Sequence, residues 1–137
     1  MEVYRNYIKG EWVRPHSGKT FVDLNPADTG EIIGSLSQSG IEELKQAIAA
    51  AAEAFLPWRD YPPGERSRIL RNAHHLMVMR EEDLARAITR EEGKTLRESK
   101  AEVQSAIKEM EFQVGEGERL YGETIPSGRR GIFSYTV

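Results

Sequence analysis

Two Gly-Lys-Thr triplets are the residues of this sequence whose types and spacing come nearest to a phosphate-binding motif. They lie at 18–20 and 93–95. A P-loop needs a further glycine five positions before the glycine of that triplet, so that backbone amides can surround the phosphates. Those positions hold Val13 and Ile88. The sequence therefore predicts that both triplets lie in turns or at helix ends and bind no phosphate.

Three glycines near the end of the chain resemble a dinucleotide fingerprint only loosely. Gly115, Gly117 and Gly122 are spaced G-x-G-x-x-x-x-G in a segment that we expect to be helical, whereas the fingerprint G-x-G-x-x-G lies at a strand-to-helix turn. We interpret them as positions of close helix packing. His74 and His75 are adjacent, so on a helix their side chains diverge by about 100° and cannot bind one metal ion together.

Acidic residues occur in runs within 81–83, 91–92 and 109–118. The first run lies where a helix N-terminus is expected, and the last alternates with apolar residues as a solvated helix face does. We therefore interpret them as surface charges, not as paired catalytic carboxylates. The sequence has no cysteine, which excludes disulfides, thiolate metal sites and a cysteine nucleophile on this chain. Residue chemistry alone assigns no catalytic and no cofactor-binding residue.

The composition of the chain excludes several classes of partner. Its 137 residues are enough for one folding unit or for a piece of a larger one. The net charge of -3 gives no basic field for nucleic acid or an anionic membrane, so neither is an expected partner. No apolar stretch is long enough to cross a membrane, and the N-terminus does not resemble a signal peptide. We therefore expect a cytoplasmic protein.

Short β-prone runs separated by glycine and proline predict two hairpin-like units within residues 1–38. The first, YRNYIKGEWV, turns at Lys9 and Gly10, and the second, FVDLNPADTGEII, turns across 25–30. Near the other end, a turn through 126–128 leads into a β-prone run over 132–137. Because the sequence stops within that run, without the polar residues that usually end a domain, we expect it to be part of a longer chain.

The first predicted helix follows the second hairpin. Ser39 and Glu42 form a capping box that predicts its start, and Pro57 predicts an end nearby. Apolar residues recur along it at steps of three and four, so one face is expected to be apolar. These residues are Ile41, Leu44, Ile48, Ala51, Phe55 and Trp58.

Two shorter helices are predicted next. One begins after the prolines at 62–63, since proline is tolerated in a first helical turn. The other spans 81–92 and is expected to bury Leu84 and Ile88. Gly93 lies where a left-handed residue would end that helix.

The fourth predicted helix is the longest. A capping box of Thr95 and Glu98 opens it, and Phe112 lies off its main apolar stripe, which indicates contact with a second surface. The stripe comprises Val103, Ile107, Met110, Val114 and Tyr121. Together, these elements predict a mixed α+β segment with N-terminal hairpins, four helices and a C-terminal strand.

Five segments, in the same order and with similar spacings, make this sequence resemble the N-terminal part of the aldehyde dehydrogenase superfamily. They are NYIKGEWV, NPADTGEII, AFLPWRDYPPGERSRIL, EEGKTLRESKAEV, and RLYGETIPS leading into FSYTV. The run MEFQVGEGERLYGETIPS is similar to the semialdehyde-oxidising branch. The resemblance implies an α/β aldehyde dehydrogenase-like fold for the full-length protein. Residues 1–137 would form an N-terminal part of its cofactor-binding domain, with an oligomerisation strand starting near 132–137.

The activity that this resemblance implies is oxidation of an aldehyde or semialdehyde to a carboxylate by a homo-oligomer that uses NAD or NADP. In the family a cysteine attacks the carbonyl carbon, an asparagine side chain helps to hold the oxyanion, and a glutamate activates water. The motifs that carry these residues, and the cofactor-binding units, would follow residue 137. We therefore expect the segment alone to bind no cofactor and to be inactive.

A monovalent-cation site is also implied, because many family members bind such an ion near the segment before Asn-Pro and the acidic residue of E-x-G-K. In this sequence the ligands would be the backbone carbonyl of Leu24 and the side chain of Glu91, with a remaining ligand from beyond residue 137. The alternative is that Glu91 simply lies at the end of the third helix. In a full-length relative, Phe112 could line the substrate tunnel, with core packing as the alternative.

A function of a different class is also compatible with the sequence. The four amphipathic helices could form a free-standing module that binds a partner or self-associates. Helix faces without cover would then be exposed, and large exposed apolar patches favour association. A compact monomer that binds little hydrophobic dye would contradict this interpretation.

Overall fold

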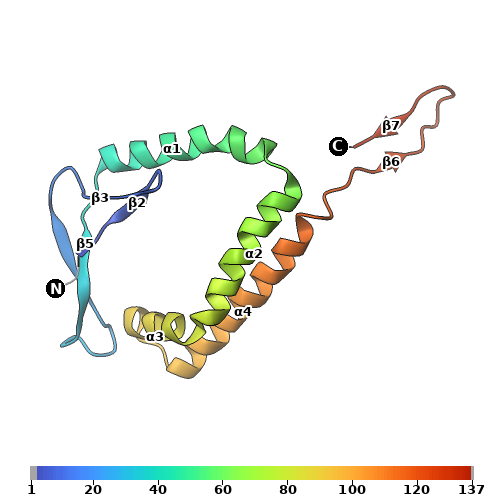
Figure 1. The fold of residues 1–137 in the computed structure, drawn as a ribbon. Coiled ribbons are helices and arrows are strands. Elements are labelled where there is room, and N and C mark those ends of the chain that lie inside the picture. Colours follow the sequence, from blue (N-terminus) through green and yellow to red (C-terminus); the bar gives the residue numbers. More distant parts are fainter. Residues whose placement is uncertain (1–2, 137) are drawn as a thin grey trace.

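A three-stranded sheet lies at the N-terminal end of the computed structural model, which describes residues 3–136 (Figure 1). The strand order is β1 (Val3–Tyr4), β5 (Ile32–Ser37) and β4 (Thr20–Leu24). Strands β4 and β5 are antiparallel and joined by residues 25–31, which confirms the second predicted hairpin. Strand β1 pairs with β5 in parallel. The sequence does not predict this pairing, because two residues are too few to show a strand pattern.

The first predicted hairpin is also confirmed. Strands β2 (Asn6–Ile8) and β3 (Glu11–Val13) are antiparallel and joined by two residues. Lys9 has φ 52° and Gly10 has φ 86°. Positive φ at both central residues is typical of the tight hairpin turn that matches the twist of the strands.

The N-cap of helix α1 (Ile41–Asp60) lies one residue later in the sequence than predicted. Its N-cap is Gly40, and Glu43, not Glu42, completes the capping interaction by accepting the Gly40 N–H at 2.7 Å. The proposed box of Ser39 and Glu42 is therefore wrong. The physical reason is that Glu43 also accepts the backbone N–H of His16 at 2.5 Å, a partner that lies 27 residues away and cannot be read locally.

The end of α1 is predicted near Pro57, and the helix continues three residues beyond it, to Asp60. A proline within a helix leaves the carbonyl four residues earlier without a donor. That carbonyl belongs to Glu53, which lies on the exposed part of the helix, so water can satisfy it. The C-cap of α1 is Tyr61, which is extended and precedes Pro62, so the helix cannot continue further.

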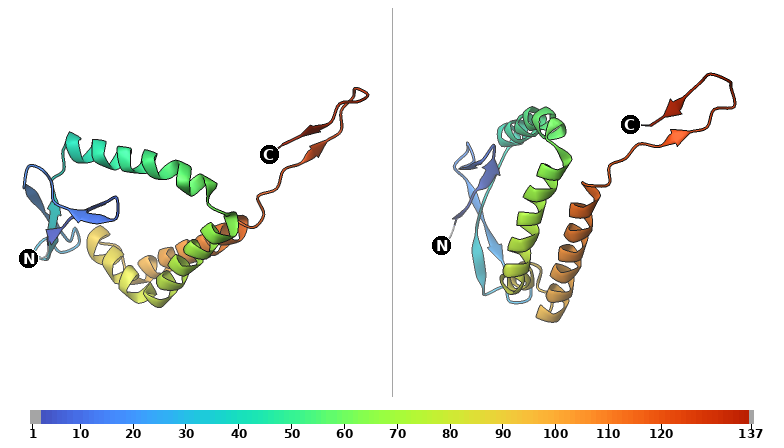
Figure 2. Two further views of the ribbon diagram at one scale, coloured as in Figure 1. Left: turned by 45° about the horizontal axis from the view of Figure 1, so that its top comes forward. Right: turned by 45° about the vertical axis from the view of Figure 1, so that its right-hand side comes forward.

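The remaining three helices confirm the predicted elements. They are α2 (Pro63–Met79), α3 (Glu81–Glu92) and α4 (Leu96–Glu116), and α4 packs along both α2 and α3 (Figures 1 and 2). Within the described residues, no helix is long and apolar enough to cross a membrane.

The core of this helical unit is small and made largely of small side chains. Its fully or nearly fully buried residues are Ala85, Val103, Val114, Ser67 and Ser99. The predicted stripe of α4 thus supplies two core residues. Leu84 and Ile88, expected to be buried, are only half-buried and flank the buried Ala85.

A third hairpin-like unit projects from the end of α4 (Figure 1). Strands β6 (Thr124–Ile125) and β7 (Ser134–Tyr135) are antiparallel. Strand β7 confirms the β-prone run predicted over 132–137, whose last residue lies outside the described part of the chain. The sequence does not predict β6, which is short and exposed.

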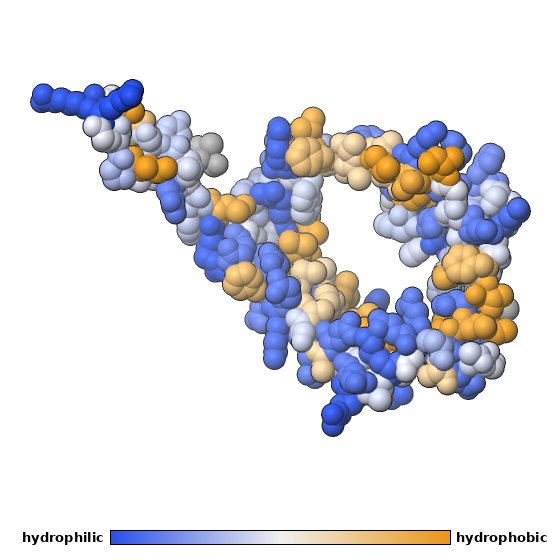
Figure 3. All heavy atoms as spheres, turned by 180° about the vertical axis from the view of Figure 1, so that it is seen from behind, coloured by the Kyte–Doolittle hydropathy of each residue, from blue (hydrophilic) through white to orange (hydrophobic). Residues whose placement is uncertain are grey.

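Helix α1 stands apart from the other three helices, so that α1, α2 and the N-terminal strands surround an opening (Figures 1 and 3). Among the described elements, α1 packs appreciably only on β2. Its predicted apolar face is present, but its large side chains are exposed. The fold therefore has an open arrangement in which one helix is held through its other face.

Candidate functional site

The loop at 25–31 and the end of α3 meet in one junction, and both belong to segments that carry the family resemblance. Asn25 is buried, with 9% of its surface exposed. Its side-chain oxygen accepts the N–H of Ala27 at 2.9 Å, and its amide donates to Glu31 Oε2 at 2.7 Å. These two hydrogen bonds close the loop on itself, as asparagine commonly does in turns.

Glu31 connects this loop to helix α3. Its Oε1 accepts a hydrogen bond from Arg90 Nε at 2.7 Å, across 59 positions of sequence. The hydrogen bond from Asn25, followed by that from Arg90, lowers the pKa of the Glu31 carboxyl below its usual value. Because both partners of the ion pair are partly exposed, it acts mainly to fix geometry.

Gly93 allows the loop to approach the turn between α3 and α4 closely. It ends α3 with φ 74°, which confirms the predicted left-handed cap. A Cβ at this position would lie 3.0 Å from the backbone nitrogen of Ala27 and 3.0 Å from Pro26 Cγ. Glycine is therefore required here both for its backbone conformation and for the lack of a side chain.

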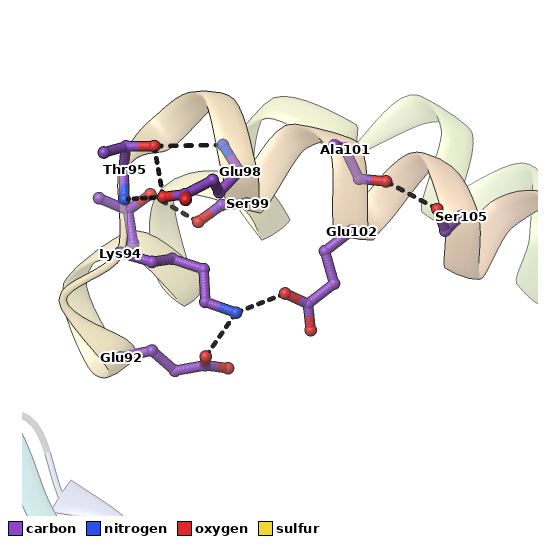
Figure 4. Close-up of polar contacts among 9 residues, drawn as sticks. Glu92, Lys94, Thr95, Glu98, Ser99, Ala101, Glu102 and Ser105 are labelled. Atoms are coloured by element: carbon purple, nitrogen blue, oxygen red, sulfur yellow. Dashed lines mark hydrogen bonds and ion pairs between the residues drawn. The ribbon is translucent and has the colours of Figure 1, made fainter.

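The second Gly-Lys-Thr triplet is structural, as predicted (Figure 4). Lys94 Nζ lies 2.6 Å from Glu92 and 2.5 Å from Glu102, and these two carboxylates raise its pKa. Thr95 accepts the N–H of Glu98 at 3.3 Å, and Glu98 accepts the N–H of Thr95 at 3.1 Å. The lysine charge is thus neutralised by glutamates and the threonine caps α4, as the capping box predicts.

The two residues expected to bind a monovalent cation lie on opposite sides of this junction. Leu24 ends β4, next to a register shift in the β4–β5 ladder, and Glu91 lies in the last turn of α3 with its side chain exposed. Glu91 shares a cavity of about 240 Å³ with Asp23 and Arg90. The described residues contain no cluster of three or more His, Cys, Asp or Glu side chains that could hold a metal ion. Carboxylate oxygens thus line this cavity from β4, through Asp23, and from α3, through Glu91. The cation site itself stays a prediction.

Three residues of this junction were missed by sequence reasoning. Asn25 and Glu31 fix the loop, and Asp23 lines the cavity beside Glu91. The Asn-Pro-x-Asp turn is a local signal for Asn25, whereas the Glu31–Arg90 pair has none. Phe112, the predicted wall residue, lies on α4 with 58% of its surface exposed, and its role remains a prediction.

The sequence and the fold match one known family. The model of the aldehyde dehydrogenase family matches residues 12–137. The chain therefore belongs to the aldehyde dehydrogenase family.

Individual relatives narrow the similarity to the semialdehyde-oxidising branch. The chain is 43% identical over 120 residues to a glutarate-semialdehyde dehydrogenase of Pseudomonas putida, which covers 88% of this chain and 25% of that protein. It is 42% identical over 134 residues to malonate-semialdehyde dehydrogenase 2 of Geobacillus kaustophilus, covering 98% of this chain and 28% of that one. The crystal structure of an NADP-dependent enzyme of E. coli superimposes with a TM-score of 0.86 at 38% identity, over 93% of this chain and 26% of the other. The chain thus spans about a quarter of the length of the relatives that it matches.

Proposed function

We propose that this chain is the N-terminal part of an aldehyde dehydrogenase that oxidises a semialdehyde to a carboxylate with NAD or NADP as hydride acceptor. The observation that carries the proposal is the family match over 12–137, together with relatives that are named semialdehyde dehydrogenases. A semialdehyde carries a carboxylate as well as the reacting aldehyde. The protein would act in the cytoplasm as a homo-oligomer, and β6 and β7 would contribute to the oligomerisation sheet, since a short exposed hairpin offers free strand edges.

The residues of this chain do not supply the reacting groups. The sequence contains no cysteine, so the nucleophile that the family uses would come from the rest of the polypeptide. The described residues contain no glycine-rich fingerprint at a strand-to-helix turn, because Gly115 lies within α4 and Gly93 caps α3. They therefore do not fit a dinucleotide, and no residue here is assigned to the cofactor.

The chain would instead act as a scaffold for the first part of the cofactor-binding domain. The Asn25–Glu31–Arg90 contacts tie the loop between β4 and β5 to α3, and they support the proposal that the Leu24 carbonyl and the Glu91 carboxylate bind a monovalent cation together. Helix α4 would present Phe112 toward the substrate. Each of these roles concerns position, and none requires proton or hydride transfer by this chain.

A chimera tests the proposed function. The segment of the Pseudomonas putida glutarate-semialdehyde dehydrogenase that aligns with this chain is replaced by residues 1–137, and NADH or NADPH formation from glutarate semialdehyde is followed. We expect turnover within about tenfold of the parent enzyme, because scaffold residues leave the reacting groups unchanged. The 137-residue chain alone is expected to give no turnover. A folded chimera without activity, or an active isolated chain, would refute the proposal.

A second candidate function is a self-associating helical module. The observation that favours it is the exposed apolar face of α1, on which Ile48 and Phe55 are each 61% exposed. Light scattering of the isolated chain across a concentration series tests it. A defined oligomer that does not bind the remainder of an aldehyde dehydrogenase would favour this candidate over the enzyme segment.

A further inference from the structure

Helix α1 has two faces that differ in what covers them. One face carries Gln46, Ala49, Ala50 and Glu53, which line a cavity of about 340 Å³ together with residues of β2 and β3. Lys9, in the turn between these strands, reaches Glu53 at 2.6 Å. The small and polar face of the helix is therefore the one that this chain itself contacts.

The opposite face, here named the α1 apolar face, is only partly covered by the described residues, and at its end the ring of Trp58 stacks on Tyr61. It consists of five large side chains that are between 42% and 61% exposed: Ile41, Leu44, Ile48, Phe55 and Trp58. Figure 3 shows apolar side chains gathered along α1, where it borders the opening through the molecule. A helix normally buries such a stripe against another element. Exposing it is costly, so this face is suited to a surface that the chain does not provide.

The open arrangement also needs support from outside. Among the elements that the structure describes, α1 packs appreciably only on β2, and α2 and α4 contact each other but leave α1 apart (Figure 2). The same arrangement occurs in a longer protein, because 93% of this chain superimposes on the E. coli NADP-dependent enzyme with a TM-score of 0.86. This chain corresponds to only 26% of that protein. In that relative, the open arrangement is therefore accompanied by additional polypeptide of the same chain.

We propose that the α1 apolar face is the docking surface for the other three quarters of an aldehyde dehydrogenase polypeptide, and that it binds that polypeptide even when the two pieces are not covalently joined. The proposal rests on the proposed function for the identity of the occupant. A second copy of this chain is the weaker choice, because about three quarters of the relative's polypeptide lies outside the superimposed part and is available to cover this face. The apolar stripe, not the charged residues beside it, carries the affinity.

Binding between two separate pieces tests the proposal directly. The probe is the Pseudomonas putida glutarate-semialdehyde dehydrogenase from which the segment aligned with this chain has been removed, and the measurement is its affinity for the 137-residue chain. The double variant Leu44→Gln/Ile48→Gln is compared with Glu42→Gln/Lys45→Gln, which removes an exposed ion pair from the same turns and leaves the net charge unchanged. We expect the first to bind about 100-fold more weakly, since burying the exposed part of each side chain is worth about a factor of ten. Equal loss in both variants would overturn the proposal.

The same variants in the covalent chimera keep the test decisive if the shortened probe does not fold. If the α1 apolar face is the docking surface, Leu44→Gln/Ile48→Gln will lower the thermal midpoint of the chimera more than Glu42→Gln/Lys45→Gln does. Equal midpoints in an active chimera would overturn the docking surface and leave the proposed function standing. If the separate pieces bind but form no NADH or NADPH, the docking surface would stand and the proposed function would be overturned. Self-association of the isolated chain that is abolished by Leu44→Gln/Ile48→Gln, with no binding of the probe, would show a second copy as the occupant and also overturn the proposal.

Discussion

The close approach of the loop at 25–31 to Gly93 predicts an unusually costly glycine substitution. In Gly93→Ala the alanine must adopt φ 74°, and its Cβ would lie 3.0 Å from both Ala27 N and Pro26 Cγ. The left-handed conformation alone costs about 1 to 2 kcal/mol for a residue with a Cβ. Displacing a backbone neighbour from a tight contact adds about 1 to 3 kcal/mol. We therefore expect Gly93→Ala to lower the free energy of unfolding by about 2 to 5 kcal/mol.

Gly18 provides a matched control for this prediction. It has φ 66°, but a Cβ at this position meets nothing within 4 Å. Gly18→Ala should therefore cost only the conformational term, about 1 to 2 kcal/mol. The assay is urea-induced unfolding of the 137-residue chain, followed by helical circular dichroism, for both variants. Equal losses would refute the claim that the loop and the α3–α4 turn are in tight contact.

Three further predictions concern packing, capping and pH. A Cβ at Gly117 would fall against Ser67 Oγ, a buried hydroxyl that has no hydrogen-bond partner among the described residues. Gly117→Ala should therefore destabilise the chain and Ser67→Ala should rescue it, measured as thermal midpoints in a double-mutant cycle. Additive midpoints would contradict this contact. Thr95→Ala removes the side-chain cap of α4 and should cost about 1 kcal/mol of unfolding free energy, whereas Thr95→Ser should cost much less. Because the folded-state pKa of Glu31 is lowered, its stabilisation is present above its ordinary pKa and is lost as the pH falls through the folded value. Glu31→Gln should therefore destabilise the chain at neutral pH but not at strongly acidic pH, and a pH-independent difference in urea midpoints would show that the ion pair does not act through titration.

Local signals predicted most of the secondary structure. The turn at Lys9 and Gly10, the helix at 81–92 and the box of Thr95 and Glu98 each depend on residues within a few positions of one another. A long-range contact caused the error at the start of α1. The start of α1 is set by Glu43, whose carboxylate also serves the backbone of His16.

The candidate site shows the same division. The resemblance pointed to the two segments that meet in the junction, and the structure places both there. It could not reveal the Glu31–Arg90 ion pair, because no local pattern links residues 59 positions apart. The exposure of the α1 apolar face could not be predicted either. Periodicity identifies an apolar stripe, but not whether the same polypeptide covers it.

The intact mass of the protein that carries this segment in its native source tests the central claim most directly. An antibody against an exposed part of the segment would capture the protein, and mass spectrometry would give its length. If the chain is the N-terminal part of an aldehyde dehydrogenase, the mass will be several times the 15.5 kDa of these 137 residues. A native mass of 15.5 kDa would contradict that account and leave a scaffold without the residues that the chemistry needs.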